Sequence, residues 1–358
     1  MKKSRIMGLI VPLILLCACA LACRGNEISV LSYNVENLFD GTKDGTEYRE
    51  FDPLLGVWTE AYYRAKLSHI GAAIRFSYDG GPDIVLLQEI ENSRVLEDLA
   101  ERELAGLGYR YRTAPDGSGA ATTIGVLSRL PITRTAVYML PPWKESPLRP
   151  VLEIHIETGE DSLIIFNNHW KSKSGGAAAT EEARKEAARV VGARVRELQK
   201  TAPGTPVIVA GDLNEQPHEY MDVGQAYQTA LLPEGVTVPD IDPENSLFLT
   251  GTLAAAGASG DRLVFFDPWA VANPASGTTA GESPPAPTGS YYYRGAWERI
   301  DHILYLPGRS DYHFKEFQAV ADPRLRDQES GAPLSWDPDR PDEGFSDHLP
   351  VLMILTEE

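Results

Sequence analysis

Residues 207–214 read VIVAGDLN, and residues 83–89 read DIVLLQE. In both stretches an unbroken apolar run of Val, Ile, Leu and Ala ends on carboxylate and amide side chains. Strands that are covered on both faces have such runs, whereas a strand with one face in water alternates apolar and polar residues. The two stretches therefore predict buried strands of an α/β protein, and each strand delivers polar groups at its end.

The rest of the chain continues this alternation of strands and helices. Apolar and β-branched segments predict strands at Glu27–Val35, Asp83–Glu89, Thr122–Leu127, Val151–Ile156, Leu163–Asn167, Val207–Ala210, Arg299–Leu306 and Leu349–Leu355. Apolar residues at helical spacing predict helices at Glu60–Tyr78, Ser93–Leu107 and Glu181–Gln199. We expect Thr180 to cap the last helix, because acidic residues follow it and basic residues come later.

Two segments have the composition of loops. Asn273–Ser290 is rich in Pro, Gly and Ser, and Asp322–Phe345 is polar and interrupted by prolines. No internal repeat divides the chain, and the predicted strands continue almost to its last residue. We therefore expect one domain over residues 27–358.

The composition excludes several classes of site. The chain has 358 residues and a net charge of −18, and all three cysteines, at positions 17, 19 and 23, lie at the N-terminus. Disulfide bridges, a cysteine nucleophile and Cys-ligated zinc are thus excluded beyond Cys23. The acidic balance also argues against a protein that holds nucleic acid on a basic surface.

The N-terminus has the pattern of an export signal. Lys2, Lys3 and Arg5 precede an apolar run, and small residues lead to Cys23. The pattern resembles a bacterial lipoprotein signal, so residues 1–22 are expected to be removed and Cys23 to be lipidated, with Cys19 as the alternative. An ordinary cleaved signal is the competing interpretation. Either predicts an exported protein, secreted or held in the cell envelope by a lipid anchor, and the mature chain has 30 basic and 51 acidic residues.

Polar side chains lie at the ends of six separate predicted strands, after four of them and at the start of the other two, which favours one shared cleft. They are two Asn, one Glu, three Asp and two His: Asn34, Glu89, His169, Asp212, Asn214, Asp301, Asp347 and His348. Carboxylate and amide oxygens are the ligands that Mg²⁺, Mn²⁺ and Ca²⁺ prefer, and imidazoles beside carboxylates suit proton transfer. Together these groups predict metal-assisted hydrolysis of a phosphate ester.

The order of the motifs resembles that of the DNase I-like endonuclease/exonuclease/phosphatase superfamily. The matching stretches are Ser32–Val35 (SYNV), Leu87–Glu89 (LQE), Gly125–Arg129 (GVLSR), Asn168–His169, Gly211–Asn214 (GDLN), Arg299–His302 (RIDH) and Ser346–Pro350 (SDHLP). They cover nearly all of the mature chain and look most like the secreted bacterial nuclease branch. The resemblance implies a four-layer α/β sandwich, in which two packed mixed β-sheets are flanked by helices.

The resemblance also implies a role for each of these residues. Glu89, Asn34 and Asp347 would form the metal end of the site, holding Mg²⁺, with Mn²⁺ or Ca²⁺ as the alternatives. The catalytic groups would be Asp212 and Asn214 at the attacking water and scissile phosphate, His348 with its tautomer fixed by Asp301, and His169 on the opposite side of the phosphate. Lys171, Lys173 and Arg299, with Tyr293, are the candidate substrate contacts.

The expected function is therefore an exported Mg²⁺-dependent phosphodiesterase, above all a nuclease on DNA or RNA. A sphingomyelinase-like or inositol-phosphate phosphoesterase of the same fold is the alternative, and such a lipid enzyme should expose an apolar docking hairpin. An inactive surface-binding lipoprotein is the alternative of another class. We infer nucleic acid and a membrane as partners, no protein partner, and a monomer.

Overall fold

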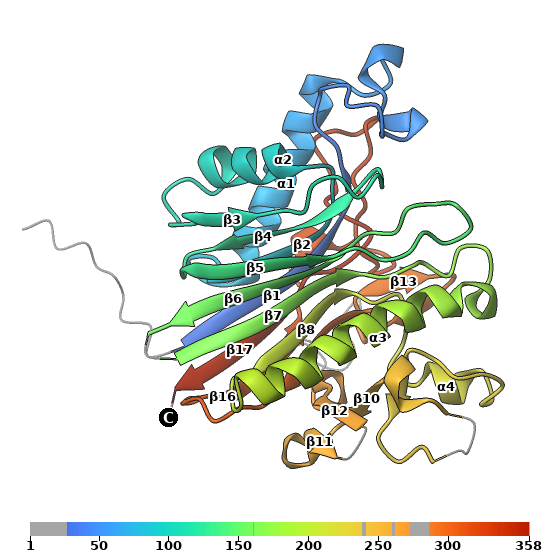
Figure 1. Ribbon diagram of the computed structural model, residues 1–358. Coiled ribbons are helices and arrows are strands. Elements are labelled where there is room, and N and C mark those ends of the chain that lie inside the picture. Colours follow the sequence, from blue (N-terminus) through green and yellow to red (C-terminus); the bar gives the residue numbers. More distant parts are fainter. Residues whose placement is uncertain (1–26, 160, 238–240, 260–261, 273–285, 358) are drawn as a thin grey trace, which may run out of the picture.

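The computed structural model describes residues 27–357 apart from residues 160, 238–240, 260–261 and 273–285. Two mixed β-sheets pack face to face in this part of the chain, and helices cover their outer faces (Figure 1). This arrangement confirms the predicted α/β sandwich. The signal sequence, Cys19 and Cys23 lie outside the described residues, as does most of the predicted loop Asn273–Ser290.

The first sheet has the strand order β16-β17-β1-β2-β4-β3. Its strands are β1 (Glu27–Leu38), β2 (Ile84–Ile90), β3 (Tyr111–Thr113), β4 (Thr123–Ser128), β16 (Tyr312–Ala319) and β17 (Val351–Glu357). Strand β1 runs parallel to β2 and antiparallel to β17, so the sheet is mixed.

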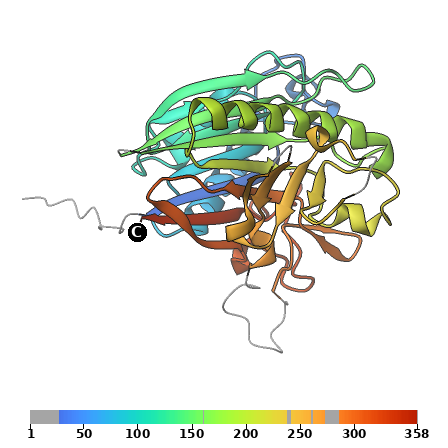
Figure 2. The same ribbon diagram turned by 60° about the horizontal axis from the view of Figure 1, so that its bottom comes forward.

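The second sheet has the order β5-β6-β7-β8-β15-β12-β10-β9, with β11 paired to β12. Its strands are β5 (Ile132–Tyr138), β6 (Val151–Thr158), β7 (Asp161–His169), β8 (Val207–Asp212), β9 (Leu231–Pro233), β10 (Leu247–Thr250), β11 (Gly257–Ser259), β12 (Arg262–Phe266) and β15 (Asp301–Leu306). Strands β7 and β8 are parallel, and β8 and β15 antiparallel. Figure 2 shows the yellow and orange strands beyond β15 extending this sheet.

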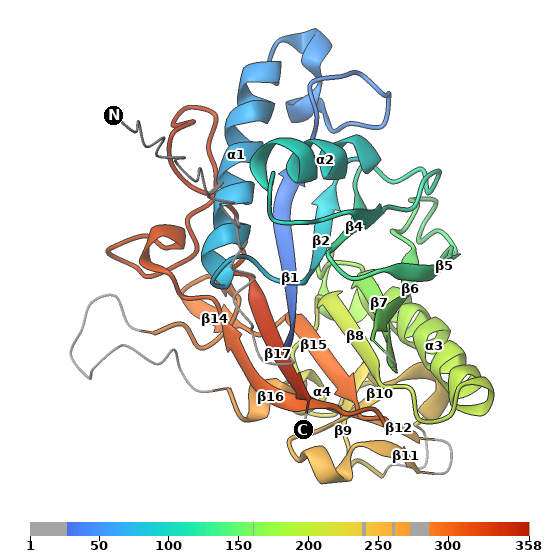
Figure 3. The same ribbon diagram turned by 90° about the vertical axis from the view of Figure 1, so that its left-hand side faces the viewer.

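Helices form the two outer layers. The helices are α1 (Glu60–Ser77), α2 (Ser93–Asp98), α3 (Ala177–Thr201) and α4 (Glu219–Asp222), with a π-helical turn at Leu99–Glu103. Shorter 3₁₀ turns lie at Arg49–Phe51, Pro53–Leu55, Pro243–Asn245, Leu253–Ala255, Pro268–Ala270 and Pro323–Leu325. Figure 3 shows α1 and α2 on one side of the paired sheets and α3 on the other.

The apolar runs of the sequence are explained by burial on both faces of each strand. In β1, Val30 faces the second sheet, whereas its neighbour Leu31 faces α1 and α2. In β2, Ile84 and Leu86 lie between the sheets, and Leu87 lies under the helices. Successive side chains of a strand point to opposite faces, so a strand in the middle of such a sandwich needs apolar residues at every position.

The sequence placed the end of one helix and the beginning of another at the wrong residues. The helix expected over Ser93–Leu107 stops being α-helical at Asp98, and a wider π turn continues to Glu103. Leu99, Ala100 and Leu104 of this segment all contact the first sheet's core, which the wider turn permits. Thr180 is not an N-cap, because α3 begins at Ala177 and the Thr180 hydroxyl donates to the carbonyl of Gly176 within the helix.

The sequence did not predict the short strands β3, β5, β9–β12 and β16. Strand β16 shows the reason: it lies at the edge of the first sheet and alternates buried and exposed residues in a polar stretch. Two further three-residue strands, β13 (Tyr291–Tyr293) and β14 (Ala296–Glu298), form a separate hairpin. Strands β3 and β9–β12, of three to five residues, carry too little periodicity to be recognised. Among the described residues, no helix is both long enough and apolar enough to span a bilayer.

Candidate active site

Three neighbouring strands of the second sheet bring their polar ends into one row. The register pairs His169 of β7 with Asp212 of β8, and Asp212 with Asp301 of β15. Gly211, beside this row, has φ +127°, and a Cβ there would lie 1.9 Å from the carbonyl oxygen of Asn168. Only glycine therefore allows β8 to approach β7 so closely just before Asp212.

The first sheet contributes Asn34 and Glu89 through two irregular strand ends. Glu36, Asn37 and Glu89 all have positive φ, and the register between β1 and β2 shifts at this point. The Asn34 side-chain amide donates to Glu89 Oε1 at 3.2 Å and to Asp212 Oδ2 at 3.1 Å. Asn34 thus connects the carboxylates of the two sheets, while its own oxygen accepts from the backbone N–H of Glu36.

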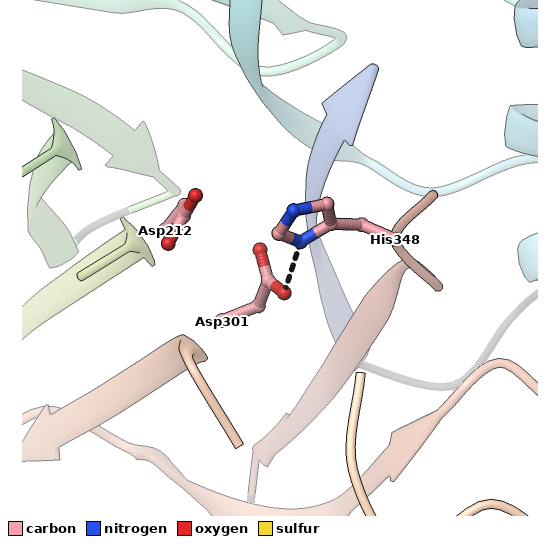
Figure 4. A group of neighbouring side chains, drawn as sticks. All are labelled: Asp212, Asp301 and His348. Atoms are coloured by element: carbon pink, nitrogen blue, oxygen red, sulfur yellow. Dashed lines mark hydrogen bonds and ion pairs between the residues drawn. The ribbon is translucent and has the colours of Figure 1, made fainter. Parts of the chain in front are cut away.

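Asp301 and His348 form a buried pair. Asp301 Oδ2 lies 2.7 Å from His348 Nδ1, and Figure 4 shows the Asp212 carboxylate across from this pair. The other oxygen of Asp301 is buried without a partner in the described structure. The Tyr291 ring lies against the imidazole, with centroids 4.6 Å apart. The contacts hold the imidazole so that Nε2 points away from Asp301.

Burial and close charges set the protonation states at this centre. Burial lowers the pKa of His348, but the charges of Asp301 and Asp347 outweigh it and hold that pKa well above the ordinary value. Burial, with the charge of Asp301, raises the pKa of Asp212 to about 7. Burial, with the charge of Arg149, holds the pKa of His169 well below its usual range. The site therefore pairs a charged His348 with a neutral His169 and a basic Asp212.

A buried ion pair fixes the loop that follows β8. Asn214 has φ +52°, its N–H donates to Asp212 Oδ1 at 2.9 Å, and its side chain donates to the carbonyl of Trp170. The next residue, Glu215, is fully buried and pairs with Arg184 of α3 at 3.2 Å. Helix α3 thereby holds the turn that presents Asp212 and Asn214.

These residues surround one cleft of about 550 Å³. Its lining comprises Asn37, Tyr48, Glu89, Arg149, His169, Ser172, Lys173, Ser174, Asp212, Asn214, Tyr291, Tyr293, Glu298, Ile300, Asp347 and His348. Asn34 and Asp301 lie just behind this wall, through the contacts given above. The eight polar residues expected at strand ends are thus brought together, although their individual roles stay predictions.

The three cations predicted as substrate contacts are placed differently. Lys173 lines the cleft and pairs with Glu219 at 2.6 Å. Lys171 lies outside the lining, and its ammonium group donates to Ser172. Arg299 also lies outside it, because its side chain donates to the carbonyl of Thr288 and lies over the ring of Trp269. Of these three predicted cations, the structure supports only Lys173 as a residue of the cleft.

The sequence missed several groups at the site. Arg149 lines the cleft, and its Nε is buried without a partner among the described residues. Lys66 of α1 is buried beneath the cleft, where its ammonium group donates to the carbonyl of Glu36. Burial and the charge of Asp347 raise the pKa of the Glu36 carboxyl to about 7. Arg149 and Lys66 belong to none of the predicted motifs, and Lys66 lies in a helix, so the sequence pattern gave no signal for them.

The donor set fits a divalent cation. Glu89 and Asp347 both present carboxylates to the cleft, with side chains 20% and 41% exposed. A second group consists of Asp212, Asp301 and His348, whose possible ligand atoms lie within 4.8 Å of one another. While His348 carries a proton, a second cation there would be repelled, so Glu89 and Asp347 offer the better position. For Asn34 to be a ligand, its oxygen would have to turn away from Glu36.

Comparison with known proteins agrees with this geometry. Residues 29–229, more than half of the chain, match the model of the endonuclease/exonuclease/phosphatase family. The chain belongs to this family. It is therefore a phosphoesterase, and enzymes of the family use divalent metal ions. No curated protein sequence shows significant similarity to it.

Solved structures of other proteins share the fold at low sequence identity. An endonuclease/exonuclease/phosphatase family protein of Bacteroides thetaiotaomicron is 16% identical with a TM-score of 0.52, covering 93% of this chain and 98% of its own. A mannosyl-6-phosphatase of the same organism is 17% identical with a TM-score of 0.51, covering 92% and 99%. Truncated TDP2 of Caenorhabditis elegans is 16% identical with a TM-score of 0.50, covering 92% and 97%. Such similarity establishes the fold, not the substrate.

Proposed function

We propose that this phosphoesterase is a divalent-metal-dependent phosphodiesterase that cleaves nucleic acid. The observation that carries the proposal is the Asp301–His348 pair, whose possible ligand atoms lie within 4.8 Å of those of the basic carboxylate Asp212 at the wall of one cleft. A phosphodiester needs a base for the attacking water and positive charge around its equatorial oxygens. The cleft offers both, together with Arg149 and Lys173 on its wall.

In this proposal each side chain has one task. Asp212 accepts a proton from the attacking water, and the N–H of Asn214 keeps the Asp212 carboxylate in place. His348 donates to a phosphate oxygen through Nε2, because Nδ1 is held by Asp301. His169 Nε2 lies 3.5 Å from Asp212 Oδ2, on the other side of that carboxylate. Glu89 and Asp347 would hold the divalent cation, which would supply positive charge at the scissile phosphate.

A lipid phosphoesterase is the second candidate, because the structure exposes an apolar segment near the cleft. Leu54, Leu55 and Val57 are 78%, 55% and 48% exposed, and Tyr48 of the same segment lines the cleft. The sequence pattern alone did not predict that this segment would be an exposed apolar surface. We rank it second, since the segment is short and contains the ion pairs of Lys43 with Glu47 and Asp52.

A panel of phosphoesters tests the ranking. We expect the mature protein, with Mg²⁺ or Mn²⁺ present and with chelator as the blank, to cleave single- or double-stranded DNA or RNA. Sphingomyelin, inositol phosphates and sugar monophosphates are the competing substrates in the same panel. The Asp212→Asn variant is the control for contaminating nucleases, and it should be inactive. Hydrolysis of a competing substrate without cleavage of nucleic acid would overturn the proposal.

We further propose that the catalytic domain spans residues 27–358 as a monomer and is exported with Cys23 as its lipid anchor. The support is the sequence pattern of residues 1–23. Expression of the full chain in a bacterium should place it in the membrane fraction, and Cys23→Ser should move it to the soluble fraction. Retention in the membrane by Cys23→Ser, with release by Cys19→Ser, would assign the anchor to Cys19.

A further inference from the structure

We propose that the tip of the β13–β14 hairpin is a stacking subsite for one base of a single-stranded nucleic acid. This inference rests on the proposed function and deepens it, because it names the form of substrate that the cleft takes. The support comes from a row of rings that begins at His348 and from an unpaired cation at the end of that row.

The rings form a continuous row from the catalytic centre to solvent. His348 and Tyr291 are 4.6 Å apart between centroids, with 30° between their planes. Tyr291 and Tyr293 are 6.1 Å apart and nearly parallel, at 15°. Both tyrosines line the cleft, and Tyr293 is 46% exposed. A planar group bound against Tyr293 would extend the row and would lie close to a phosphate at His348.

The hairpin is built so that these two tyrosines share one face. Residues two apart in a strand point the same way, so Tyr291 and Tyr293 face the cleft together. Tyr292 points to the other side, where its ring meets Trp297 edge to face at 5.2 Å. The hairpin is also joined to the catalytic segment by a bridge between Tyr291 and His348. The row is therefore positioned by the same backbone that positions the imidazole.

A tight turn places a cation on the outermost ring. Arg294 and Gly295 both have positive φ, at 49° and 88°, as a two-residue turn of this kind requires. The Arg294 guanidinium lies over the Tyr293 ring, 5.1 Å from its centroid. Arg294 takes part in none of the ion pairs found among the described residues. A base that stacks on Tyr293 would displace the Arg294 guanidinium from the ring, and Arg294 could then meet the neighbouring phosphate. A stacking ring beside a guanidinium that makes no ion pair combines the two features that bind single strands without sequence preference.

The chemistry of this subsite separates nucleic acid from the competing substrates. A base offers a π face to Tyr293 and a neighbouring phosphate to Arg294, whereas a sugar phosphate offers no flat ring. A duplex keeps its bases stacked within itself, so only an unpaired base is free to lie on an exposed tyrosine. The acidic surface is consistent with this mode, since few phosphates are contacted.

The test compares intact and abasic single strands on four proteins. Single-stranded DNA oligonucleotides carry either a normal base or an abasic analogue at one position next to the cleaved phosphate. We expect Tyr293→Ala to lower kcat/KM on the intact strand by about 5- to 100-fold, and Tyr293→Phe to retain it. With the abasic strand, kcat/KM of the wild type should fall by a similar factor. The kcat/KM of Tyr293→Ala should be nearly the same on the abasic strand as on the intact strand. Tyr111→Ala, which removes a partly exposed tyrosine of β3 outside the cleft lining, is the control and should match the wild type.

A binding measurement keeps this inference separate from the proposed function. A strand with 2-aminopurine at the same position is mixed with the Asp212→Asn variant, with or without Tyr293→Ala. Quenching that disappears with Tyr293→Ala supports the stacking subsite even if the wild type cleaves no nucleic acid. Equal quenching with and without Tyr293→Ala, or equal kcat/KM losses by Tyr293→Ala on intact and abasic strands, overturns the inference.

Discussion

At the scale of single residues, the site depends on how one proton is shared among buried groups. Asp212 and Asp301 lie opposite each other in the register of β8 and β15, and both are almost completely buried. The nearby charge of Asp301 adds to burial in raising the affinity of Asp212 for a proton. The charge of His348 offsets part of this repulsion, and it lowers the pKa of Asp212. Removal of one member should therefore disturb the other two.

The first prediction concerns Asp301→Asn. An amide retains the size of the carboxylate but removes the charge that keeps His348 protonated, and its N–H₂ would favour the wrong tautomer at Nδ1. We expect kcat/KM to fall by about 10³-fold or more. An NMR titration of the ring should show a lower pKa for His348 than in the wild type.

Asp98→Asn is a matched control for that variant. Asp98 is also buried and accepts from Tyr63 at 2.8 Å, but it lies outside the cleft lining. Its substitution should lower the melting temperature and leave kcat/KM unchanged. An Asp301→Asn protein with normal activity would remove Asp301 from the catalytic group.

The second prediction concerns the acidic limb of the pH–rate profile. The pKa of Asp212 is raised to about 7, so without a cation it loses its role as a base as the pH falls through that value. A divalent cation nearby favours the ionised carboxylate. The acidic limb of kcat/KM should therefore move to lower pH, by about one unit, as Mg²⁺ is raised from limiting to saturating concentration. A limb that does not respond to Mg²⁺ would mean that another group titrates.

At the scale of secondary-structure elements, a buried carboxylate joins the second sheet to α3. Glu153 of β6 accepts from Tyr138 of β5, from the ring of His155, and from Arg194 of α3 at 2.7 Å. Burial alone would raise the pKa of Glu153, but these three bonds outweigh it and lower the pKa to about 2. Helix α3, which holds the loop after β8, is thus itself attached to the second sheet by the ion pair between Arg194 and Glu153.

The third prediction follows from that pKa. A carboxyl whose folded pKa lies below its unfolded value of 4.5 stabilises the fold above pH 4.5, and the effect is lost as the pH falls toward 2. Urea denaturation should show Glu153→Gln to be less stable than the wild type by about 3 kcal/mol at pH 6. The difference should narrow toward pH 2.

Glu157→Gln is the matched control, because Glu157 is an exposed residue of the same strand. It should unfold like the wild type at every pH. A stability difference between wild type and Glu153→Gln that does not change between pH 6 and pH 2 would show that the loss comes from packing and not from the charge.

At the scale of the whole molecule, a net charge of −18 limits how the substrate is held. The cations at the cleft and its hairpin are few: Arg149, Lys173 and Arg294, and Lys173 already pairs with Glu219. Affinity for single strands falls with salt in proportion to the phosphates contacted. Substrate binding should therefore depend on the divalent metal ion and on base stacking more than on a basic protein surface.

The fourth prediction is a shallow salt dependence. At saturating Mg²⁺, a plot of log kcat/KM against log NaCl concentration should have a slope no steeper than about −2, for at most three phosphate contacts. Arg294→Gln should make the slope shallower by about 0.7. A slope of about −4 or steeper would show that phosphates bind a surface outside this cleft.

The sequence predicted the sandwich, through the resemblance of its motifs to a known family, and eight of the polar groups at the site. Strands buried on both faces need unbroken apolar runs, so β1, β2, β7 and β8 were recognisable, and residues that end such runs, such as Asp212, stood out. The short strands and the π turn after α2 have no such sequence pattern. Contacts with neighbouring elements of the fold, rather than their own apolar periodicity, stabilise them.

Tertiary structure alone decided how the polar groups act on one another. The orientation of the Asn34 oxygen, the position of Arg299 outside the cleft, and the approach of Arg149 and Lys66 to the site depend on how the folded chain brings these residues together. Residue type fixes which charges and hydrogen bonds are available. Distance, burial and register then fix which of them meet, and these quantities exist only in the folded chain.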